Sequence, residues 1–284
     1  MSLEKIYIIR HGFRSNWTVD PATGIYSAYI PSPTGIPADP ALTAHGVTQA
    51  KELARHLMAL DPPIEAVYSS PFYRCVETLA PFMRLHQEQY PHHEIKIVPE
   101  DGISEWFGSA PFHHPQPATA HVLKGLLPGI DDSHVSVVVP SSRGETLVQL
   151  QHRVAVALRG IIARCDADGR RALLVCTHAA VVIMLGRILT GQVPASPDEE
   201  DFKAFTCGLS VYSRGDCRGS PPAYLNGAYA INETDRNIIG GWTCHRNSDC
   251  SFLSGGEERG WKMSADESFP GTSSLSQGDA KSKF

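Results

Sequence analysis

Residues 6–17 read IYIIRHGFRSNW, and this stretch decides how the rest of the chain is interpreted. Its first four residues are apolar and rich in β-branched side chains, which is typical of a strand buried on both faces. The glycine after the strand permits a sharp exit of the backbone and close approach to a ligand. Ligands of open α/β sheets bind outside the carboxyl ends of the strands. We therefore expect Arg10 and His11 at the mouth of a site, with Arg14 and Asn16 close behind in the exit loop.

Two guanidinium groups beside an imidazole suit a phosphate ester. Arginine side chains bind phosphate oxygens through paired hydrogen bonds, and a histidine nitrogen can attack phosphorus. An Arg-His-Gly triplet also occurs by chance, and a single histidine is more often simply packed or exposed. The interpretation therefore depends on what the other strand ends carry.

The composition excludes several classes of protein. The 284 residues suffice for one large domain, or for one domain with an appendage. The net charge of -5 gives no basic surface of the kind that binds nucleic acid directly. No apolar run approaches the length that spans a bilayer, and the N-terminus enters the first strand without room for a signal peptide. Seven scattered cysteines favour reduced thiols over a disulfide framework, so we expect a cytoplasmic protein, with the nucleus as the alternative.

Strands and helices are predicted to alternate along the chain. Further strands are expected at 66–69, 94–98, 172–176 and 204–212, and helices at 43–57, 72–82, 144–165 and 179–189, the second of them ended by Pro81. Two loop segments, 20–40 and 100–140, are expected to set substrate specificity, and the second contains a short helix at 118–127. The alternation predicts a three-layer α/β/α sandwich with a mostly parallel central sheet.

The composition changes after this α/β domain, which we assign to residues 1–214. Residues 215–263 are predicted to form a small β-rich or irregular extension, with hairpin strands at 224–242 and 250–263. Residues 264–284 have the composition of a disordered tail.

Three of the predicted strands end in groups that suit phosphate chemistry. These groups are Arg10 and His11 after the first strand, Arg74 after strand 66–69, and His178 and Ala179 after strand 172–176. Helix N-termini, such as the one that Ala179 opens, favour anions through their free N–H groups. Taken singly, Arg74 could be a solvated helix residue and His178 a packed core histidine. Their common position at one edge of one sheet favours a phosphate pocket.

Five short motifs follow one another between residues 4 and 213. They are Arg10-His11-Gly12, Leu42-Thr43-x-x-Gly46-x-x-Gln49-Ala50, Ser70-Pro71-x-x-Arg74-x-x-x-Thr78, Glu105-Trp106 and Thr177-His178. This series resembles the histidine phosphatase superfamily, also called phosphoglycerate mutase-like, in its first branch. The resemblance implies an α/β fold and a phosphohistidine intermediate.

The resemblance also implies a role for each matching position. His11 is the nucleophile, Arg10, Arg74 and His178 complete the phosphate pocket, and Glu105 is the general acid. Neighbouring guanidinium groups should lower the pKa of His11, which keeps its ring neutral for attack. Desolvation beside two aromatic residues is expected to raise the pKa of Glu105, as a general acid requires. The nearby carboxylates at positions 100 and 101 are alternatives for this role.

Departures from the family pattern separate a phosphatase from a mutase. Many members have Glu-Ser after Arg-His-Gly and a Trp-Asn pair slightly later, whereas this chain has Phe13-Arg14 and then Asn16-Trp17. Arg14 resembles the extra phosphate-binding arginine of eukaryotic phosphatases such as the Sts group. Residues 254–261 resemble fungal proteins related to the 55 kDa tau subunit of transcription factor C of RNA polymerase III, which carry such a phosphatase domain.

The leading prediction is a metal-independent phosphomonoester hydrolase without a cofactor, acting on a small phosphorylated metabolite, with a phosphoprotein as an alternative substrate. Cys244, His245 and Cys250 lack zinc-site spacing, so no metal site is expected. One alternative is a phosphoglycerate-type mutase. Another, from a different class, is a phosphatase-like protein-interaction module of a larger assembly. Neither nucleic acid nor membrane is an expected direct partner, whereas a homodimer or a protein complex is compatible with the sequence.

Overall fold

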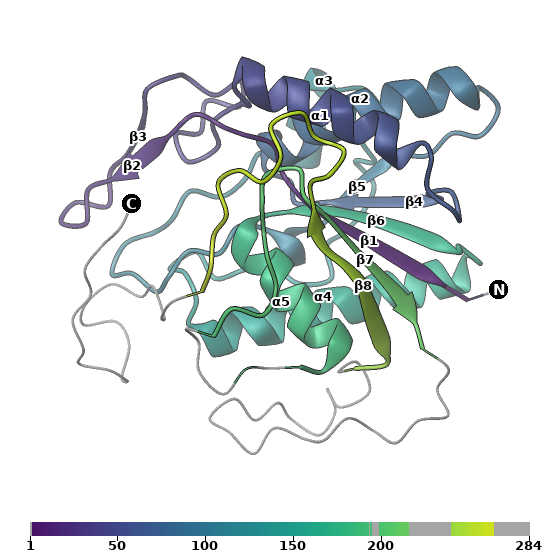
Figure 1. Ribbon diagram of the computed structural model, residues 1–284. Helices are drawn as coiled ribbons and strands as arrows, with labels where there is room; N and C mark the ends of the chain where they lie inside the picture. The colour runs from purple at the N-terminus through teal and green to yellow at the C-terminus, as the bar shows by residue number, and fades with distance from the viewer. Residues whose placement is uncertain (1, 193, 195–198, 216–239, 264–284) are drawn as a thin grey trace.

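A six-stranded sheet forms the centre of the molecule (Figure 1). The structure is a computed structural model that describes residues 2–192, 194, 199–215 and 240–263. The strands lie in the order β5 (Ile97–Pro99), β4 (Ala66–Ser69), β6 (Ala172–Thr177), β1 (Lys5–Arg10), β7 (Leu209–Arg214) and β8 (Trp242–Asp249). Strands β5, β4, β6 and β1 are parallel, β7 is antiparallel to β1, and β8 is antiparallel to β7. The prediction of a mostly parallel central sheet is confirmed.

Helices cover both faces of the sheet and complete the three layers (Figure 1). Helices α1 (Ala44–Leu57) and α2 (Tyr73–Gln89) lie on one face, and α4 (Leu147–Ala167) and α5 (Ala179–Thr190) lie on the other. Ile6 and Ile8 of β1 pack into the core with α4 and α5, whereas Tyr7 and Ile9 pack into the core with α1 and α2. A strand between two apolar layers has no polar face, which explains the continuous apolar run.

The carboxyl ends of β1, β4 and β6 meet at one edge of this sheet. Arg10 is paired with Thr177 in the register of β1 and β6. The backbone continues this pairing beyond the strands, because His11 N–H donates to the Thr177 carbonyl at 3.0 Å and Ser70 N–H donates to the Cys176 carbonyl at 2.9 Å. The segments that carry the predicted site are therefore fixed to one another by main-chain hydrogen bonds.

Helix α2 does not end at Pro81, and this prediction was wrong. The helix contains Pro81 and continues to Gln89. A proline inside a helix removes one backbone hydrogen bond and costs about 3 kcal/mol. Phe82 and His86, which follow Pro81, are both buried, and their ring centroids lie 5.9 Å apart. Tertiary burial of this kind, rather than local propensity, stabilises most protein helices.

Several element boundaries differ from those predicted. Strand β5 is confined to the three residues that pair with β4, and β7 begins at Leu209 because the chain turns at Cys207, whose φ is 56°. Helix α4 begins only at Leu147, since Thr146 and Gln149 form a capping box before it. The predicted helix in the second loop segment is α3 (Ala120–Leu126). A small hairpin of β2 (Trp17–Val19) and β3 (Tyr26–Ala28), which was not predicted, lies in the exit loop after β1.

The C-terminal part of the described chain joins the same sheet. Strand β8 pairs with β7, so residues beyond 214 contribute an edge strand. The predicted strands at 250–263 are absent from the described residues, and this segment instead runs through turns and packs Leu253 and Met263 into the cores. Most of the other predicted hairpin, 224–242, and the tail 264–284 lie outside the described residues. None of the described helices has the length and apolarity needed to cross a membrane.

Candidate active site

The nucleophile candidate His11 is buried and its ring has a defined orientation. The side chain is 2% exposed, and Nδ1 lies 2.8 Å from the carbonyl oxygen of Gly12. A carbonyl oxygen only accepts, so Nδ1 carries the proton and donates, and the lone pair of the neutral ring lies on Nε2. Burial, followed by the charges of Arg74 and Arg10, holds the pKa of His11 well below its ordinary value. The predicted direction of the shift is confirmed, with burial as its largest cause.

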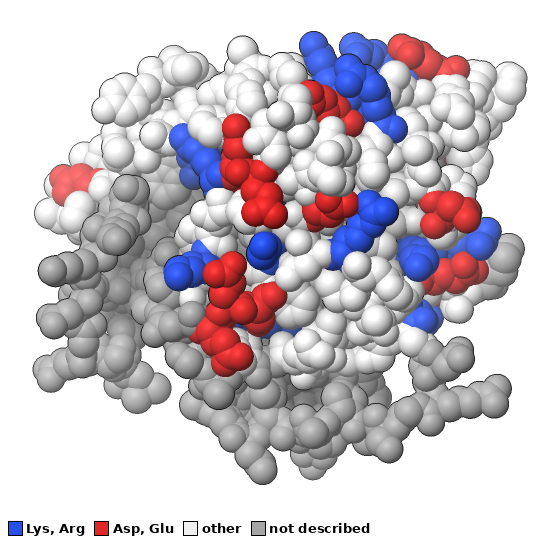
Figure 2. Space-filling view, viewed as in Figure 1, with Lys and Arg blue, Asp and Glu red and all other residues white. Residues whose placement is uncertain are grey.

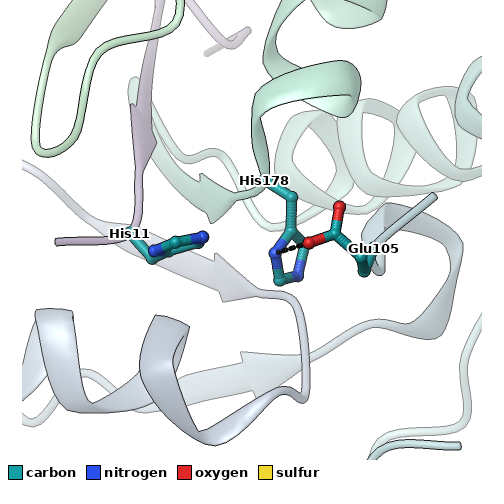
Figure 3. Close-up of side chains that lie close together, drawn as sticks. All are labelled: His11, Glu105 and His178. Carbon is teal, nitrogen blue, oxygen red and sulfur yellow. Dashed lines mark ion pairs between the residues drawn. The ribbon is translucent and has the colours of Figure 1, made fainter. Parts of the chain in front are cut away.

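His178 lies beside His11, and each of its ring nitrogens has a polar neighbour. The two ring centroids are 5.3 Å apart, and Nδ1 of His178 lies 3.2 Å from a carboxylate oxygen of Glu105 (Figure 3). Its Nε2 lies 2.7 Å from the hydroxyl of Ser70. Burial alone would lower the pKa of His178, but the Cys75 thiol and Glu105 raise it above the ordinary value. The surroundings of the two histidines thus shift their pKa values in opposite directions, down for His11 and up for His178.

Arg74 is held in the interior of the site by ion pairs and a carbonyl. Its side chain is fully buried, donates to the Ala38 carbonyl at 3.0 Å and forms ion pairs with Asp39 at 3.2 Å and Glu105 at 3.0 Å. Its guanidinium carbon lies 4.6 Å from the centre of the Phe72 ring. Because these contacts fix both its position and its plane, the solvated-helix alternative for Arg74 is excluded.

Arg10 and Arg14 complete a group of three arginines. One Nη of Arg10 donates to the Ala204 carbonyl at 2.7 Å, and one Nη of Arg14 donates to the Ser15 carbonyl at 2.9 Å. Burial lowers the pKa of Arg10 to about 10 and that of Arg14 to about 9, so both remain charged at neutral pH. Within the described part of the chain, the Nε–H groups of Arg10, Arg14 and Arg74 are buried without a hydrogen-bond partner. Buried donors of this kind are the feature that an anion with several oxygens would satisfy.

Glu105 departs from the electrostatic expectation. Its carboxylate is 16% exposed and lies against both Arg74 and His178. Burial raises the pKa of Glu105, but the charges of His178 and Arg74 outweigh burial and hold it well below its ordinary value. The expected rise in its pKa was therefore wrong for the unliganded site, because the phosphate-binding cations themselves pair with this carboxylate.

Asn16 and Ala179 lie in two different settings. Asn16 is exposed at the rim, where its side-chain oxygen accepts from an Nη of Arg259 at 3.2 Å. Ala179 is the first residue of α5, directly after His178, which is the N-cap of that helix. The two carboxylates weighed against Glu105 serve other purposes: Glu100 pairs with His134, and Asp101 accepts from Ser136.

Several supporting residues were not identified from the sequence. Asp39 lies in a loop without periodicity, and only its contact with Arg74 reveals it. Ser70 and Thr78 belong to a recognised motif, but their contacts are structural findings: Ser70 holds His178, and Thr78 accepts from the Gly12 N–H at 3.0 Å. Gln49 likewise accepts from the N–H of Phe13 at 3.0 Å. The exit loop of β1 is thus fixed by side chains from α1 and α2.

The three central side chains could also be read as metal ligands. Ligand atoms of His11, Glu105 and His178 lie within 4.8 Å of one another. The surrounding guanidinium groups of Arg10, Arg14 and Arg74 would repel a divalent cation at this position. The donor set therefore suits an anion better than a metal ion.

A small, shallow cleft lies beside Glu105. It is lined by Phe72, Phe107, Pro115, Gln116, Pro117 and Ser141, among others. Its residues come from the N-cap of α2, from the 100–140 segment that was expected to set specificity, and from residues 141–145 that follow this segment. The cleft places apolar and aromatic groups next to the carboxylate where a leaving group would depart.

Comparisons with known proteins agree with this geometry. Residues 6–221 match the model of the family described as histidine phosphatase superfamily (branch 1). The chain is 34% identical over 283 residues to the transcription factor tau 55 kDa subunit of Saccharomyces cerevisiae, covering 93% of this chain and 59% of that protein. It is 27% identical over 223 residues to the ecdysteroid-phosphate phosphatase of Drosophila melanogaster, covering 69% of this chain and 28% of that protein. The chain therefore spans less than two thirds of the length of either relative.

A solved structure shows the same fold. The ecdysone phosphate phosphatase from Bombix mori, crystallised with tungstate, superposes with a TM-score of 0.55 at 22% identity, over 81% of this chain and 98% of that one. The match of the family model, over most of the chain, includes β1 with His11 and β6 with the His178 that follows it. The chain belongs to branch 1 of the histidine phosphatase superfamily.

Proposed function

We propose that this protein hydrolyses small phosphate monoesters through a phosphohistidine formed on His11. The observation that carries the proposal is the fixed, neutral ring of His11 beside Arg10, Arg14 and Arg74, whose buried Nε–H groups lack partners among the described residues. A neutral nitrogen is the nucleophilic form, and fixed guanidinium groups stabilise the charge of a transferring phosphoryl group. The phosphatases among the relatives support the same reaction class.

The reaction takes two displacements at phosphorus. In the first, Nε2 of His11 forms a bond to phosphorus while the ester P–O bond breaks and Glu105, in its acid form, donates a proton to the departing oxygen. In the second, Glu105 as carboxylate takes a proton from water, whose oxygen attacks phosphorus, and the P–N bond breaks to release inorganic phosphate. Arg74 and the His178 imidazolium bind the equatorial oxygens throughout.

The lowered pKa of Glu105 is compatible with this role. In the structure its charge is stabilised by Arg74 and His178. A substrate dianion would take over both cations and would repel the neighbouring carboxylate, and each change raises the pKa of Glu105. The acid form is thus generated by substrate binding, and the carboxylate returns when phosphate leaves.

Metal independence is part of the proposal. Its support is the group of guanidinium side chains at the site. They can stabilise the charge of the phosphoryl group, which a metal ion does as a Lewis acid in metal-dependent phosphatases. Hydrolysis of para-nitrophenyl phosphate by the full chain is expected to persist in EDTA. Stimulation by added zinc after chelation would contradict this part.

The central test uses His11→Ala. This variant should lose turnover of para-nitrophenyl phosphate by several orders of magnitude and should no longer form an acid-labile phosphoenzyme under rapid quenching. Arg171→Ala, at the opposite end of the sheet, is the control, since the side chain of Arg171 forms an exposed ion pair with Glu4. A fully active His11→Ala protein would refute the mechanism.

The phosphatase is favoured over a mutase by Arg14, which lies in the exit loop together with Arg10. A mutase must pass the phosphoryl group to a second substrate hydroxyl before water reaches it. Release of inorganic phosphate at the rate of ester consumption is therefore expected. Isomerisation of a phosphoglycerate with little release of phosphate would support the mutase.

A second role follows from the similarity to the tau 55 kDa subunit, which extends over 93% of this chain. We propose that the chain also takes part in a protein assembly related to transcription and resides in the nucleus. Tagged full-length chain and its His11→Ala variant are expected to co-purify with the same subunits from nuclear extract. Recovery of the chain alone, at its monomer mass, would count against this role.

A further inference from the structure

The segment that follows β8 returns to the mouth of the site. In Figure 1 this segment passes beside α1, and its contacts show how it is held. The carbonyl oxygen of Glu258 accepts from Thr206 N–H at 3.1 Å. The Glu258 carboxylate pairs with His45 at 2.6 Å and accepts from Gln49 at 2.7 Å. The next residue, Arg259, is therefore presented at a fixed place over the exit loop of β1.

The guanidinium group of Arg259 is immobilised beside the phosphate pocket. Its carbon lies 3.9 Å from the centre of the Phe13 ring. One Nη donates to the side-chain oxygen of Asn16 at 3.2 Å and to the carbonyl of Arg14 at 3.4 Å. The carbonyl oxygen of Arg259 in turn accepts a short hydrogen bond from Arg10. Arg259 thus contacts each residue of the exit loop that was assigned to phosphate binding.

The backbone of Arg259 is in an unusual conformation. Its φ is 46°, in the left-handed region that few residues other than glycine adopt. A glycine would adopt this conformation without a steric penalty, and the next residue is a glycine, Gly260. The chain nevertheless has an arginine at the residue with the positive φ. Strain of this kind persists where the surrounding contacts hold it, often at ligand sites.

The charge of Arg259 is not balanced within the described residues. No carboxylate among them pairs with its guanidinium, because Glu258 points to His45 and Gln49, and Glu257 lies near Lys203. The other charged groups that face the site are Arg10, Arg14, Arg74, Asp39, Glu105 and His178. Four guanidinium groups against the two carboxylates leave two positive charges, before His178 and the Cys75 thiol beside it are considered. A phosphate monoester supplies at most about two negative charges.

We infer that Arg259 forms a second anion subsite, which binds a negatively charged substituent on the leaving group of a small phosphate ester. The inference rests on the proposed function. Among the described residues, only one Nη of Arg259 has hydrogen-bond partners, and its Nε and second Nη match a carboxylate or a second phosphate group in a bidentate geometry. Because Arg259 lies outside residues 6–221, which match the family model, specificity for such substrates comes from the C-terminal segment.

The test compares two nearly isosteric esters, 3-carboxyphenyl phosphate and 3-carbamoylphenyl phosphate, which differ in one negative charge. The wild-type chain should show a higher kcat/KM for the carboxyl ester. Arg259→Gln should reduce the ratio of the two kcat/KM values at least tenfold, mainly through KM. Arg259→Lys should retain part of the ratio, since it keeps the charge but loses the bidentate geometry. Arg171→Gln, at the opposite end of the sheet, should leave the ratio unchanged.

The outcomes separate the inference from the proposed function. If the wild-type chain hydrolyses neither ester, the proposed function fails. If it hydrolyses both and Arg259→Gln keeps the wild-type ratio, the subsite is refuted while the phosphatase stands. If Arg259→Gln does not fold, the salt dependence of the wild-type chain is the test. Its preference for the carboxyl ester should decrease as the salt concentration rises. Equal kcat/KM values for the two esters at low salt would overturn the subsite.

Discussion

At the scale of single residues, the site shifts the pKa values of two adjacent histidines in opposite directions. The pKa of His11 is lowered because the ring is buried beside guanidinium groups, and the pKa of His178 is raised because that ring contacts a thiol and a carboxylate. The two ring centroids are only 5.3 Å apart, so the difference arises from their other neighbours. One histidine can then serve as the nucleophile while the other binds oxygens of the same phosphoryl group.

The lowered pKa of His11 gives a stability prediction. Below about pH 6.5 the unfolded chain binds a proton at His11 that the folded chain does not, so this residue makes the folded state lose stability as pH falls. The loss reaches at most about 1.4 kcal/mol per pH unit. His11→Ala should therefore be more stable, relative to wild type, at pH 5 than at pH 7.5. Chemical denaturation at both pH values measures this, and a pH-independent difference would contradict it.

Glu105→Gln tests the general acid through the leaving group. A glutamine cannot donate the proton, so alkyl phosphates, whose alkoxide leaves poorly, should lose about 100- to 10,000-fold in kcat. Para-nitrophenyl phosphate needs little protonation and should lose much less. Steady-state kcat values of wild type and Glu105→Gln on both substrates give the comparison. An equal loss on both substrates would assign Glu105 to binding alone.

At the scale of secondary structure, the close approach of α1 to the exit loop fixes the backbone that follows His11. A Cβ at Gly46 would lie 2.0 Å from the carbonyl oxygen of Phe13. Thr43 caps α1 through the Gly46 N–H and also donates to the same carbonyl of Phe13 at 3.1 Å. The start of the helix and the loop that carries His11 therefore form one packed unit.

Gly46→Ala should disturb this unit. The added methyl group meets backbone rather than a flexible side chain, so the folded state should lose about 1–3 kcal/mol, and kcat should fall because the loop beside His11 must shift. Gly125→Ala is the matched control, because a Cβ at Gly125 in α3 meets no atom within 4 Å. That change should stabilise by about 0.5–1 kcal/mol. Thermal unfolding and para-nitrophenyl phosphate assays distinguish the two variants.

The elements that were predictable are those with a physical signature in the local sequence. Strand β1 is apolar throughout because both of its faces are buried, and α1 carries a capping threonine and an apolar stripe. Strand β8, by contrast, reads WTCHRNSD and has little apolar character, since it is an edge strand that pairs only with β7. Strands β2 and β3 have three residues each, too few to show alternation.

The same distinction applies to the site. Arg10, His11, Arg74 and His178 were predictable because each follows a recognisable strand. Asp39 and Arg259 were not, because they lie in segments without periodicity and are identified only by contacts across the fold. The pKa of Glu105 could not be predicted either, since its sign depends on which cations lie opposite in space.

At the scale of the whole molecule, the arginines of the site are not part of a broad basic surface on the face that Figure 2 draws. Figure 2 shows acidic and basic side chains interspersed on the face drawn, without a broad region of one sign. The chain as a whole carries a net charge of -5. A small anion attracted to the pocket would thus meet a local field opposite in sign to that of the whole protein, and long-range attraction of polyanions is not expected.

Gln49 connects the exit loop of β1 to the C-terminal segment, so its replacement should loosen that segment. Its side chain accepts from Phe13 N–H and donates to Glu258 and to Thr206. Gln49→Ala should cost about 1–3 kcal/mol through unsatisfied buried groups. It should also increase hydrogen exchange at residues 252–262, while Gln87→Ala, on the exposed side of α2, should change neither. Unaltered exchange in Gln49→Ala would show that the segment is held by other contacts.

The hydrogen bond between Nδ1 of His11 and the carbonyl of Gly12 also determines an isomer. With Nδ1 engaged by the backbone, Nε2 is the nitrogen available to phosphorus, so the proposed mechanism predicts the tele-phosphohistidine rather than the pros form. The two isomers differ in ³¹P chemical shift and in recognition by isomer-specific antibodies. The orientation of one imidazole ring, set by its neighbour's carbonyl, thus prescribes the chemical identity of a species that exists only during turnover.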